Sequence, residues 1–172
     1  ATGSGTDFTL ANGTATIAGG STSTTLTIAG IVDDSLDEAD ETIIITLSNP
    51  TNANPGATLV HTYTITDNDS APVVDFNTTS SNGAESVSSA DLTVDLSAAS
   101  AQNITVDYAV TGTATGSGTD FTLANGTLTI NAGATSGTIN ISSIIDDSID
   151  EANETVIVTL SNPSNATLGS DD

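Results

Sequence analysis

The sequence predicts an all-β protein made of tandem antiparallel β-sandwich modules, and three features support this prediction. Short runs rich in β-branched residues alternate apolar and polar side chains, which is typical of strands with one buried face. Asn-Gly and Asn-Pro pairs separate the runs, as at Asn12-Gly13 and Asn162-Pro163, and such pairs favour turns. Residues 1–50 recur without a gap as residues 114–163, so the same fold is encoded twice.

The strands are best defined in the second copy, where the pattern is that of a sandwich with about seven strands. We expect strands over residues 73–77, 91–97, 104–110, 127–130, 138–141 and 155–160. In the last of these, Val156, Val158 and Leu160 point to one face and the residues between them point to the other. The same alternation recurs in the first copy over residues 43–47, and a further strand is expected there over 59–66.

The domain organisation follows from the repeat, whose copies are offset by 113 residues (114 − 1), an ordinary length for a domain. The first copy enters the repeat at the position of Ala114, and the second ends before the strand expected over 59–66. A short linker at 70–72 contains a proline that stiffens it. We therefore expect residues 1–70 to form the C-terminal part of a first module. Residues 71–172 are expected to form a second module without its last strand, so that both are incomplete sections of a longer array.

The charge balance is extreme, with 22 acidic residues and no Lys or Arg among 172 residues. Nucleic acids and anionic membranes bind through Lys and Arg, so neither is expected as a partner. No apolar run approaches the ~20 residues of a membrane span, so no membrane insertion is expected. The absence of Cys excludes a disulfide framework and a thiolate metal site. The charge favours cations as ligands.

An enzyme is not expected from these residues. The single histidine, His61, has no counterpart in the second copy, and its alternation with Leu59 and Tyr63 predicts a place on the sandwich wall. Without Lys, Arg or Cys the chain also lacks the usual groups that stabilise an oxyanion or clamp a phosphate.

Two acidic runs lie between predicted strands, at residues 33–41 and again at 146–154. Such dense carboxylates repel one another unless a cation lies among them; the alternative is a solvated acidic loop. Calcium suits them because it takes 6–8 oxygen ligands in flexible geometry, whereas zinc prefers His and Cys. The spacing matches neither an EF-hand loop nor the nonapeptide of a calcium-binding β-roll.

The ordered motifs of the chain resemble the Calx-β repeat. These motifs are GTATGSGTDF at 112–121, GTLTI at 126–130, IIDDSIDEANET at 144–155, VTLSNPSNATLG at 158–169 and YTITDND at 63–69. The repeat occurs in sodium–calcium exchangers, integrin β4 and long bacterial surface proteins. The resemblance implies an immunoglobulin-like sandwich of seven strands that binds several Ca²⁺ ions at the end where the chain leaves the module.

The resemblance also implies which side chains bind the metal, position by position. In the first module they are Asp7, Asp33, Asp34, Glu38, Glu41, Asp67 and Asp69. In the second module they are Glu85, Asp120, Asp146, Asp147, Glu151 and Glu154. Ser35 and Ser148 stand where the family often has a third acidic residue, and Asn68 interrupts the terminal group. Asp171 and Asp172 are expected in a loop rather than in the site.

The function that these features favour is a calcium-binding structural repeat of a long extracellular surface protein, such as an adhesin stalk or fibre. Its Ca²⁺ ions would stiffen the joints between modules, and its partners would be neighbouring repeats of the same or an identical chain. The alternative is a regulatory calcium sensor of the exchanger type. A cadherin-like adhesion module is a further alternative, because residues 67–72 resemble the calcium linker of that family.

Overall fold

The computed structural model describes residues 1–3, 5–148, 150 and 152–170, and its described part is all-β, which confirms the predicted fold class. The strands are β1 (Glu41–Thr46), β2 (Val60–Ile65), β3 (Val73–Phe76), β4 (Ser89–Leu96), β5 (Ile104–Gly112), β6 (Gly126–Ile130), β7 (Ser136–Ser142), β8 (Val156–Ser164) and β9 (Thr167–Leu168). Within these ranges there is no helix long and apolar enough to cross a membrane.

The chain divides into two compact units, which are described separately. Unit 1 comprises Ala1–Ser35 and Ala39–Asn68, and unit 2 comprises Leu36–Glu38 and Asp69–Asp172. The three residues Leu36–Glu38 lie in the first acidic run, yet they belong to unit 2.

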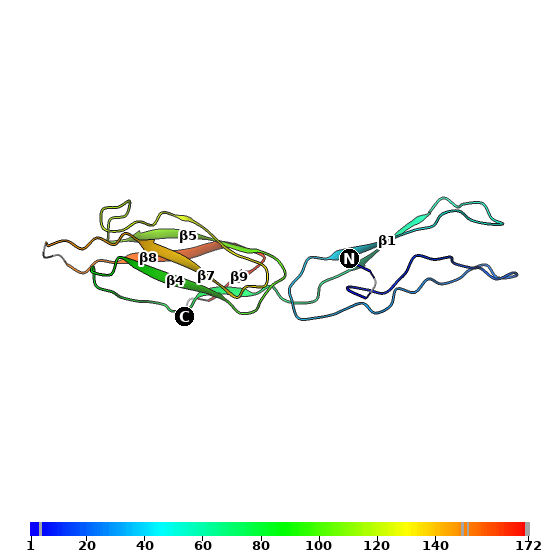
Figure 1. Cartoon of the computed structure of the whole chain (residues 1–172), viewed down its shortest axis with the longest axis horizontal. Helices are drawn as coiled ribbons and strands as arrows, with labels where there is room; N and C mark the ends of the chain where they lie inside the picture. The colour runs from blue at the N-terminus through cyan, green and yellow to red at the C-terminus, as the bar shows by residue number, and fades with distance from the viewer. Residues whose placement is uncertain (4, 149, 151, 171–172) are drawn as a thin grey trace. The chain divides into compact units, whose positions relative to one another are not determined.

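Unit 2 is a two-sheet sandwich whose strands are all hydrogen-bonded to neighbours (Figure 1). One sheet has the order β7-β4-β3-β9, and the other has the order β6-β5-β8. The alternating pattern explains the core, because the apolar positions of each strand point between the sheets. The buried side chains of the main core cluster are Val74, Val94, Leu96, Ile104, Val106, Ile130 and Ile139. Burying each one fully is worth about 1.5–3 kcal/mol relative to exposure.

The six strands predicted for the second copy are all present, with small shifts at their ends. Val156, Val158 and Leu160 are half-buried while Ile157 and Thr159 are exposed, as the alternation predicts. β8 nevertheless runs past its predicted end to Ser164. The pairing of β8 with β5 slips between Thr105 and Asp107, and a bulge of this kind tolerates a proline inside the strand.

β9 was not predicted from the sequence. It is only the two residues Thr167–Leu168, and it pairs in parallel with β3 through Val73 and Val74. Periodicity cannot reveal a strand this short, because at least four residues are needed to show alternation. β8 itself lies at one edge of its sheet, beside β5.

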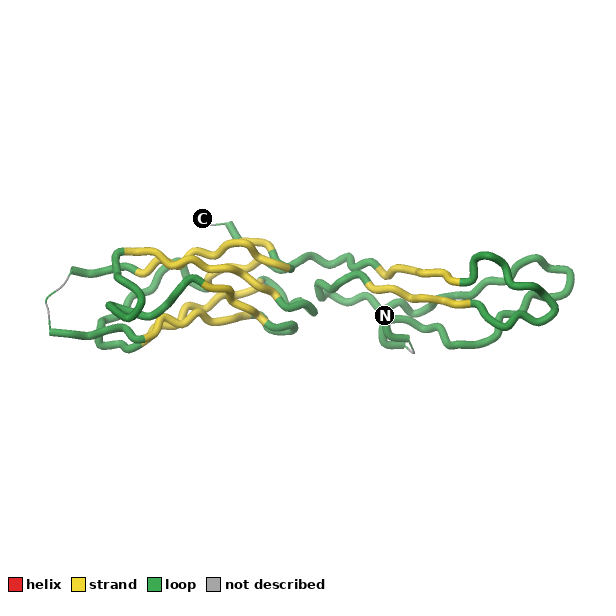
Figure 2. The backbone as a smooth tube through the Cα atoms, turned by 90° about the horizontal axis from the view of Figure 1, so that it is seen from above, coloured by secondary structure: helices red, strands yellow, loops and turns green. Residues whose placement is uncertain are grey.

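Among the described residues of unit 1 there is one antiparallel strand pair, β1 with β2, in which Ile43 lies opposite Tyr63. Its buried apolar side chains are Phe8 and Ile43. Segments 13–17 and 23–29 are the repeat counterparts of β6 and β7, but they form no strand. Unit 1 is therefore mostly loop outside β1 and β2, as Figure 2 shows.

The turns after β1 and in β8 have the same backbone in both copies. Asn49 and its counterpart Asn162 have φ values of 51° and 47°, and Asn52 and Asn165 have φ values of 60° and 58°. Asparagine tolerates this left-handed conformation better than most residues with a side chain, which explains its use at both positions.

Candidate metal centre

Asp120 closes a tight turn at one end of unit 2. Its Oδ2 accepts a hydrogen bond of 2.6 Å from the Thr115 amide, and its own amide donates to the Thr115 carbonyl at 2.9 Å. The turn is anchored by Phe121, which is buried, and the Gly118 amide donates to the Phe121 carbonyl at 2.8 Å. A Cβ on Gly116 would lie 3.3 Å from the Phe121 ring, so glycine allows this close approach. The aspartate is therefore held rigidly by its own loop.

The same turn holds both ends of the second acidic run. The Ile145 amide, directly before the paired aspartates, donates to the Asp120 carbonyl at 2.9 Å. At the other end, the Ala114 amide donates to the Thr155 carbonyl at 3.1 Å, directly after Glu154. Four predicted ligands are thereby brought to one end of unit 2: Asp120, Asp146, Asp147 and Glu154.

Glu85 lies at this end as well. It is in a turn closed by a 3.0 Å hydrogen bond from the Val87 amide to the Ala84 carbonyl. The Ser88 carbonyl then accepts from the Ile144 amide at 3.1 Å, just before the acidic run. The end of unit 2 where β4 begins and β7 ends thus carries Glu85 too. The predicted ligand Glu151 lies outside the described residues, and so do Asp171 and Asp172.

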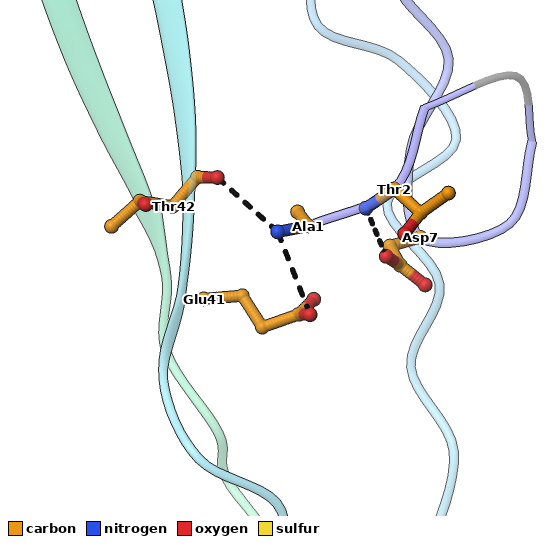
Figure 3. Close-up of polar contacts among 5 residues, drawn as sticks. All are labelled: Ala1, Thr2, Asp7, Glu41 and Thr42. Atoms are coloured by element: carbon orange, nitrogen blue, oxygen red, sulfur yellow. Dashed lines mark hydrogen bonds and ion pairs between the residues drawn. The ribbon is translucent and has the colours of Figure 1, made fainter.

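Unit 1 repeats this arrangement (Figure 3). The Thr2 amide donates to Asp7 Oδ2, and the Asp7 carbonyl accepts from the Val32 amide at 2.9 Å, directly before Asp33 and Asp34. The nitrogen of Ala1 lies 3.3 Å from the Thr42 carbonyl and 3.5 Å from Glu41 Oε1. The turn contacts of Asp7 are those of Asp120, and the Ala1 nitrogen meets the Thr42 carbonyl as the Ala114 amide meets that of Thr155, so the two copies bring equivalent carboxylates together. The ion pair with Glu41 belongs to the charged first residue and has no counterpart at Ala114.

Asp67, from the acidic group at the end of the first module, contacts the first acidic run. Glu41 begins β1 opposite Ile65, the last residue of β2, so the chain leaves the pair beside Glu41. The Asp67 amide donates to Asp40 Oδ1 at 3.0 Å, which fixes Asp67 against the acidic run. Asp40 was not predicted as a site residue. Its repeat counterpart is Asn153, so the duplicated pattern does not mark it.

Not every carboxylate of the first run serves this arrangement. Asp37 belongs to unit 2, where its Oδ2 lies 2.9 Å from the hydroxyl of Ser100, a residue only 1% exposed. The Ala101 amide donates to the Asp37 carbonyl at 3.0 Å, and the Gln102 side chain reaches the carboxylate at 3.4 Å. Asp37 therefore has a structural partner. Glu38 and Asp69 also belong to unit 2, although the sequence grouped them with the first module.

The donor chemistry of these loops fits calcium. The side-chain donors are carboxylates. Four of them are exposed, namely Asp33, Asp34, Asp146 and Asp147. The chain has no Lys or Arg to pair with them. Calcium accepts such an all-oxygen set, including bidentate carboxylates and backbone carbonyls. Among the described residues, however, no three acidic or histidine side chains form a ready metal cage. The structure thus places the acidic loops at one end of each unit without a formed cage among the residues that it describes.

Two further groups lie outside this arrangement. Asp107, on the outer face of β5, accepts a 2.7 Å hydrogen bond from the Thr127 hydroxyl and a weaker one from Asn162, and these bonds lower the pKa of its carboxyl. His61 is exposed on β2 and lines an open groove together with Leu59 and Tyr63.

The match to a family model agrees with the tandem organisation of the chain. The model of the Calx-beta domain family matches residues 1–69 and again residues 67–169. The chain is similar to the crystal structure of CBD12 from CALX1.2, with a TM-score of 0.48 and 25% identity over 93% of this chain and 62% of that one. It is similar to the calcium binding domain CBD12 of CALX1.1, with a TM-score of 0.44 and 24% identity over 84% of this chain and 55% of that one. The chain therefore spans less than two thirds of either solved structure. The comparison with curated protein sequences gave no match.

Proposed function

Because this chain belongs to the Calx-β domain family, we propose that it is a calcium-binding module with one acidic site in each copy of its repeat. The observation that carries the proposal is a backbone hydrogen bond between the aspartate turn and the acidic run, which is present in both copies. In unit 2 it is the hydrogen bond from Ile145 to Asp120, and in unit 1 it is the equivalent bond from Val32 to Asp7. A solvated acidic loop would not need a hydrogen bond to the aspartate turn in both copies.

The residues that would hold the ion follow from the same contacts. In unit 2 they are Asp120, Asp146, Asp147, Glu154 and Glu85. In unit 1 they are Asp7, Asp33, Asp34, Glu41 and Asp67. Bound Ca²⁺ supplies the positive charge that the chain lacks, and it offsets the repulsion between carboxylates gathered at one end of each unit. The chain supplies the fixed turn, through the hydrogen bonds to Asp7 and Asp120, and the exposed aspartate pairs that follow Val32 and Ile145.

The first candidate for the larger role is regulatory, of the calcium-sensor type. It is favoured by Asp37, which lies in the same acidic run as Asp33 and Asp34 and is bonded to Ser100 and Ala101 of unit 2. A change in the run when Ca²⁺ binds would act directly on these hydrogen bonds.

The second candidate is a structural repeat of an extracellular surface protein. It is favoured by the near-identity of the two copies, since residues 1–14 and 114–127 are the same letter for letter. Near-identical copies suit an array whose units have one mechanical task. The extracellular location and the stalk role stay predictions.

Isothermal titration calorimetry with CaCl₂ tests the proposed binding. We expect saturable binding by the unaltered chain and a loss of at least about tenfold in affinity at the unit 2 site for Asp146→Asn, which corresponds to about 1.4 kcal/mol. Asp91→Asn is the matched control, because Asp91 is also exposed but accepts a 2.6 Å hydrogen bond from Asn140 on the face of a strand. Absence of saturable binding, or equal losses in the two variants, would overturn the proposal.

Amide hydrogen exchange at Ala101 separates the two larger roles. The regulatory role predicts that its exchange rate changes when Ca²⁺ is added, because this amide donates to the Asp37 carbonyl. The structural role predicts that the rate at this amide changes no more than that of the core amide of Val94, which provides the internal reference for overall stabilisation.

A further inference from the structure

Two Asn-Gly pairs of unit 2 have the same sequence but different surroundings. One is Asn82-Gly83, between β3 and β4, and the other is Asn125-Gly126, where β6 begins. Both asparagines are exposed, so water reaches the two side chains alike. A difference in their chemistry therefore depends on how the backbone and the side-chain amide are held.

Asn125-Gly126 is held on both sides of its peptide bond. Asn125 Oδ1 accepts a 2.8 Å hydrogen bond from the Val110 amide of β5. Gly126 lies opposite Tyr108 in the ladder between β5 and β6. A Cβ on Gly126 would lie 2.6 Å from the Tyr108 hydroxyl, so the tyrosine side chain covers this residue. Rotation within this pair requires loss of the side-chain hydrogen bond and opening of the ladder.

Asn82-Gly83 lies in a loop that is fixed only on either side of it. Before the pair, the Asn77 amide donates to the Thr93 carbonyl at 2.9 Å. After the pair, the Val87 amide donates to the Ala84 carbonyl at 3.0 Å. Between these points, residues 78–83 are exposed and form no hydrogen bond with the described part of the chain. A Cβ on Gly83 would meet nothing within 4 Å.

An asparagine that precedes glycine loses its side-chain amide when the backbone attacks it. The glycine nitrogen forms a bond to the asparagine Cγ, the bond from Cγ to Nδ2 breaks, and the proton of the glycine amide leaves with Nδ2 as ammonia. Water then adds to either carbonyl of the cyclic imide and leaves aspartate or isoaspartate. Glycine favours the attack, because it has no Cβ beside the nitrogen and its backbone rotates freely.

We propose that Asn82 is a site of spontaneous deamidation in the folded chain, and that Asn125 is protected from the same reaction. The Gly83 nitrogen reaches Asn82 Cγ by rotation within an unbonded segment. Asn125 must first lose its hydrogen bond and leave the ladder. Such a hydrogen bond contributes about 1 kcal/mol, and opening a core strand costs more.

The product adds one carboxylate to unit 2. It stands three residues before Glu85, which lies at the same end of the unit as Asp120. The reaction consumes water and needs no metal, so it is independent of the proposed calcium binding.

The test follows both asparagines in the full chain during incubation in mildly alkaline buffer. A protease that cleaves after Glu separates them, because Asn82 precedes Glu85 and Asn125 follows it. Mass spectrometry of the fragments then measures conversion at each asparagine. An Asn12→Gln background removes the Asn-Gly pair of unit 1. We expect conversion at Asn82 to be at least about tenfold faster than at Asn125.

Gly83→Ala is the matched variant, because an added methyl group has open space there and Gly83 does not have a positive φ. It should slow conversion at Asn82 at least about tenfold, since the new Cβ hinders the attacking nitrogen, and leave Asn125 unaffected. Circular dichroism checks that the variant keeps the fold. In concentrated urea, the two asparagines of the chain with Gly83 should react at comparable rates, because both lose their surroundings.

Three outcomes would overturn the proposal. The first is conversion at Asn82 that is absent or no faster than at Asn125 in the folded chain. The second is an unchanged rate at Asn82 in the Gly83→Ala variant. The third is a difference between the two asparagines that persists in urea, because the fold would then not be its cause.

Discussion

Ile139 and Leu26 occupy the same repeat position in different surroundings. Substituting each by alanine measures how much the burial of the side chain contributes to the free energy of unfolding. Ile139 is 3% exposed and belongs to the buried core of unit 2, so Ile139→Ala loses the transfer free energy of its side chain and leaves a cavity. The expected cost is about 2–5 kcal/mol. Leu26 is 45% exposed beside an open groove. Leu26→Ala loses about half of the transfer contribution and encloses no cavity, so it should cost about 1 kcal/mol or less.

Urea unfolding followed by tyrosine fluorescence makes this comparison, because the chain has two tyrosines, Tyr63 in unit 1 and Tyr108 in unit 2, and no tryptophan. In a Tyr63→Phe background the signal reports unit 2 alone. Ile139→Ala should lower its midpoint by about 1–2 M urea. In a Tyr108→Phe background, Leu26→Ala should shift the unit 1 midpoint far less. Equal shifts for the two substitutions would refute the assignment of one position to a closed core and the other to an open groove.

Three other predictions follow from single contacts. Thr127→Val should raise the pKa of Asp107 toward the ordinary value of about 3.9, as followed by carboxyl NMR, because it removes the strongest hydrogen bond that lowers this pKa. Since the pKa of Asp107 is lowered in the folded state, its stabilisation is present above the unfolded-state pKa and is lost as pH falls through the folded-state pKa. If Thr127→Val left the pKa of Asp107 unchanged, the hydrogen bond would not be the cause of the shift. Excess CaCl₂ at about 100 times Kd should stabilise the chain by about 2.7 kcal/mol relative to EGTA, and an unchanged calorimetric Tm would count against calcium binding. Ser100→Ala should destabilise unit 2 by about 1 kcal/mol and speed amide exchange at Ala101, and unaltered exchange would show that the hydroxyl does not hold Asp37.

The strands of unit 2 were predictable because each is long enough to show its alternation. The apolar residues of β4, β5 and β8 face the core in the register that the pattern requires. β9 and the extension of β8 through Pro163 were not predictable, since both depend on pairing with strands far away in the chain. Pairing energy, rather than local pattern, decides such elements.

Unit 1 shows the limit of sequence reasoning most clearly. Residues 12–14 and 125–127 are the same three letters, but only the second copy continues into a strand, β6. A strand needs a neighbour to satisfy its backbone groups, and β5 is the neighbour in unit 2. The turn at Asp7 needs no such neighbour, because its hydrogen bonds are local, and it is the same in both units.

The arrangement of the candidate ligands could be inferred where it repeats, while their binding of a metal stays a prediction. Asp7, Asp33 and Asp34 and their counterparts are brought together by equivalent hydrogen bonds in the two copies. Asp40 and Asp37 were missed because their partners, Asp67 and Ser100, are distant in the sequence and the contacts are not marked by the duplication. The acidic run alone does not show that Asp40 bonds to Asp67 and that Asp37 bonds to Ser100.

The central claim is that the acidic loops bind calcium, and native mass spectrometry tests it most directly. The chain would be sprayed from ammonium acetate after exchange with CaCl₂ or with EGTA, and MgCl₂ would serve as the ionic control. The account predicts a discrete mass increase equal to a whole number of Ca²⁺ ions that survives dilution and falls in a variant carrying Asp33→Asn and Asp146→Asn. An identical mass in CaCl₂ and EGTA, or the same broad adduct series with Ca²⁺ and Mg²⁺, would contradict it.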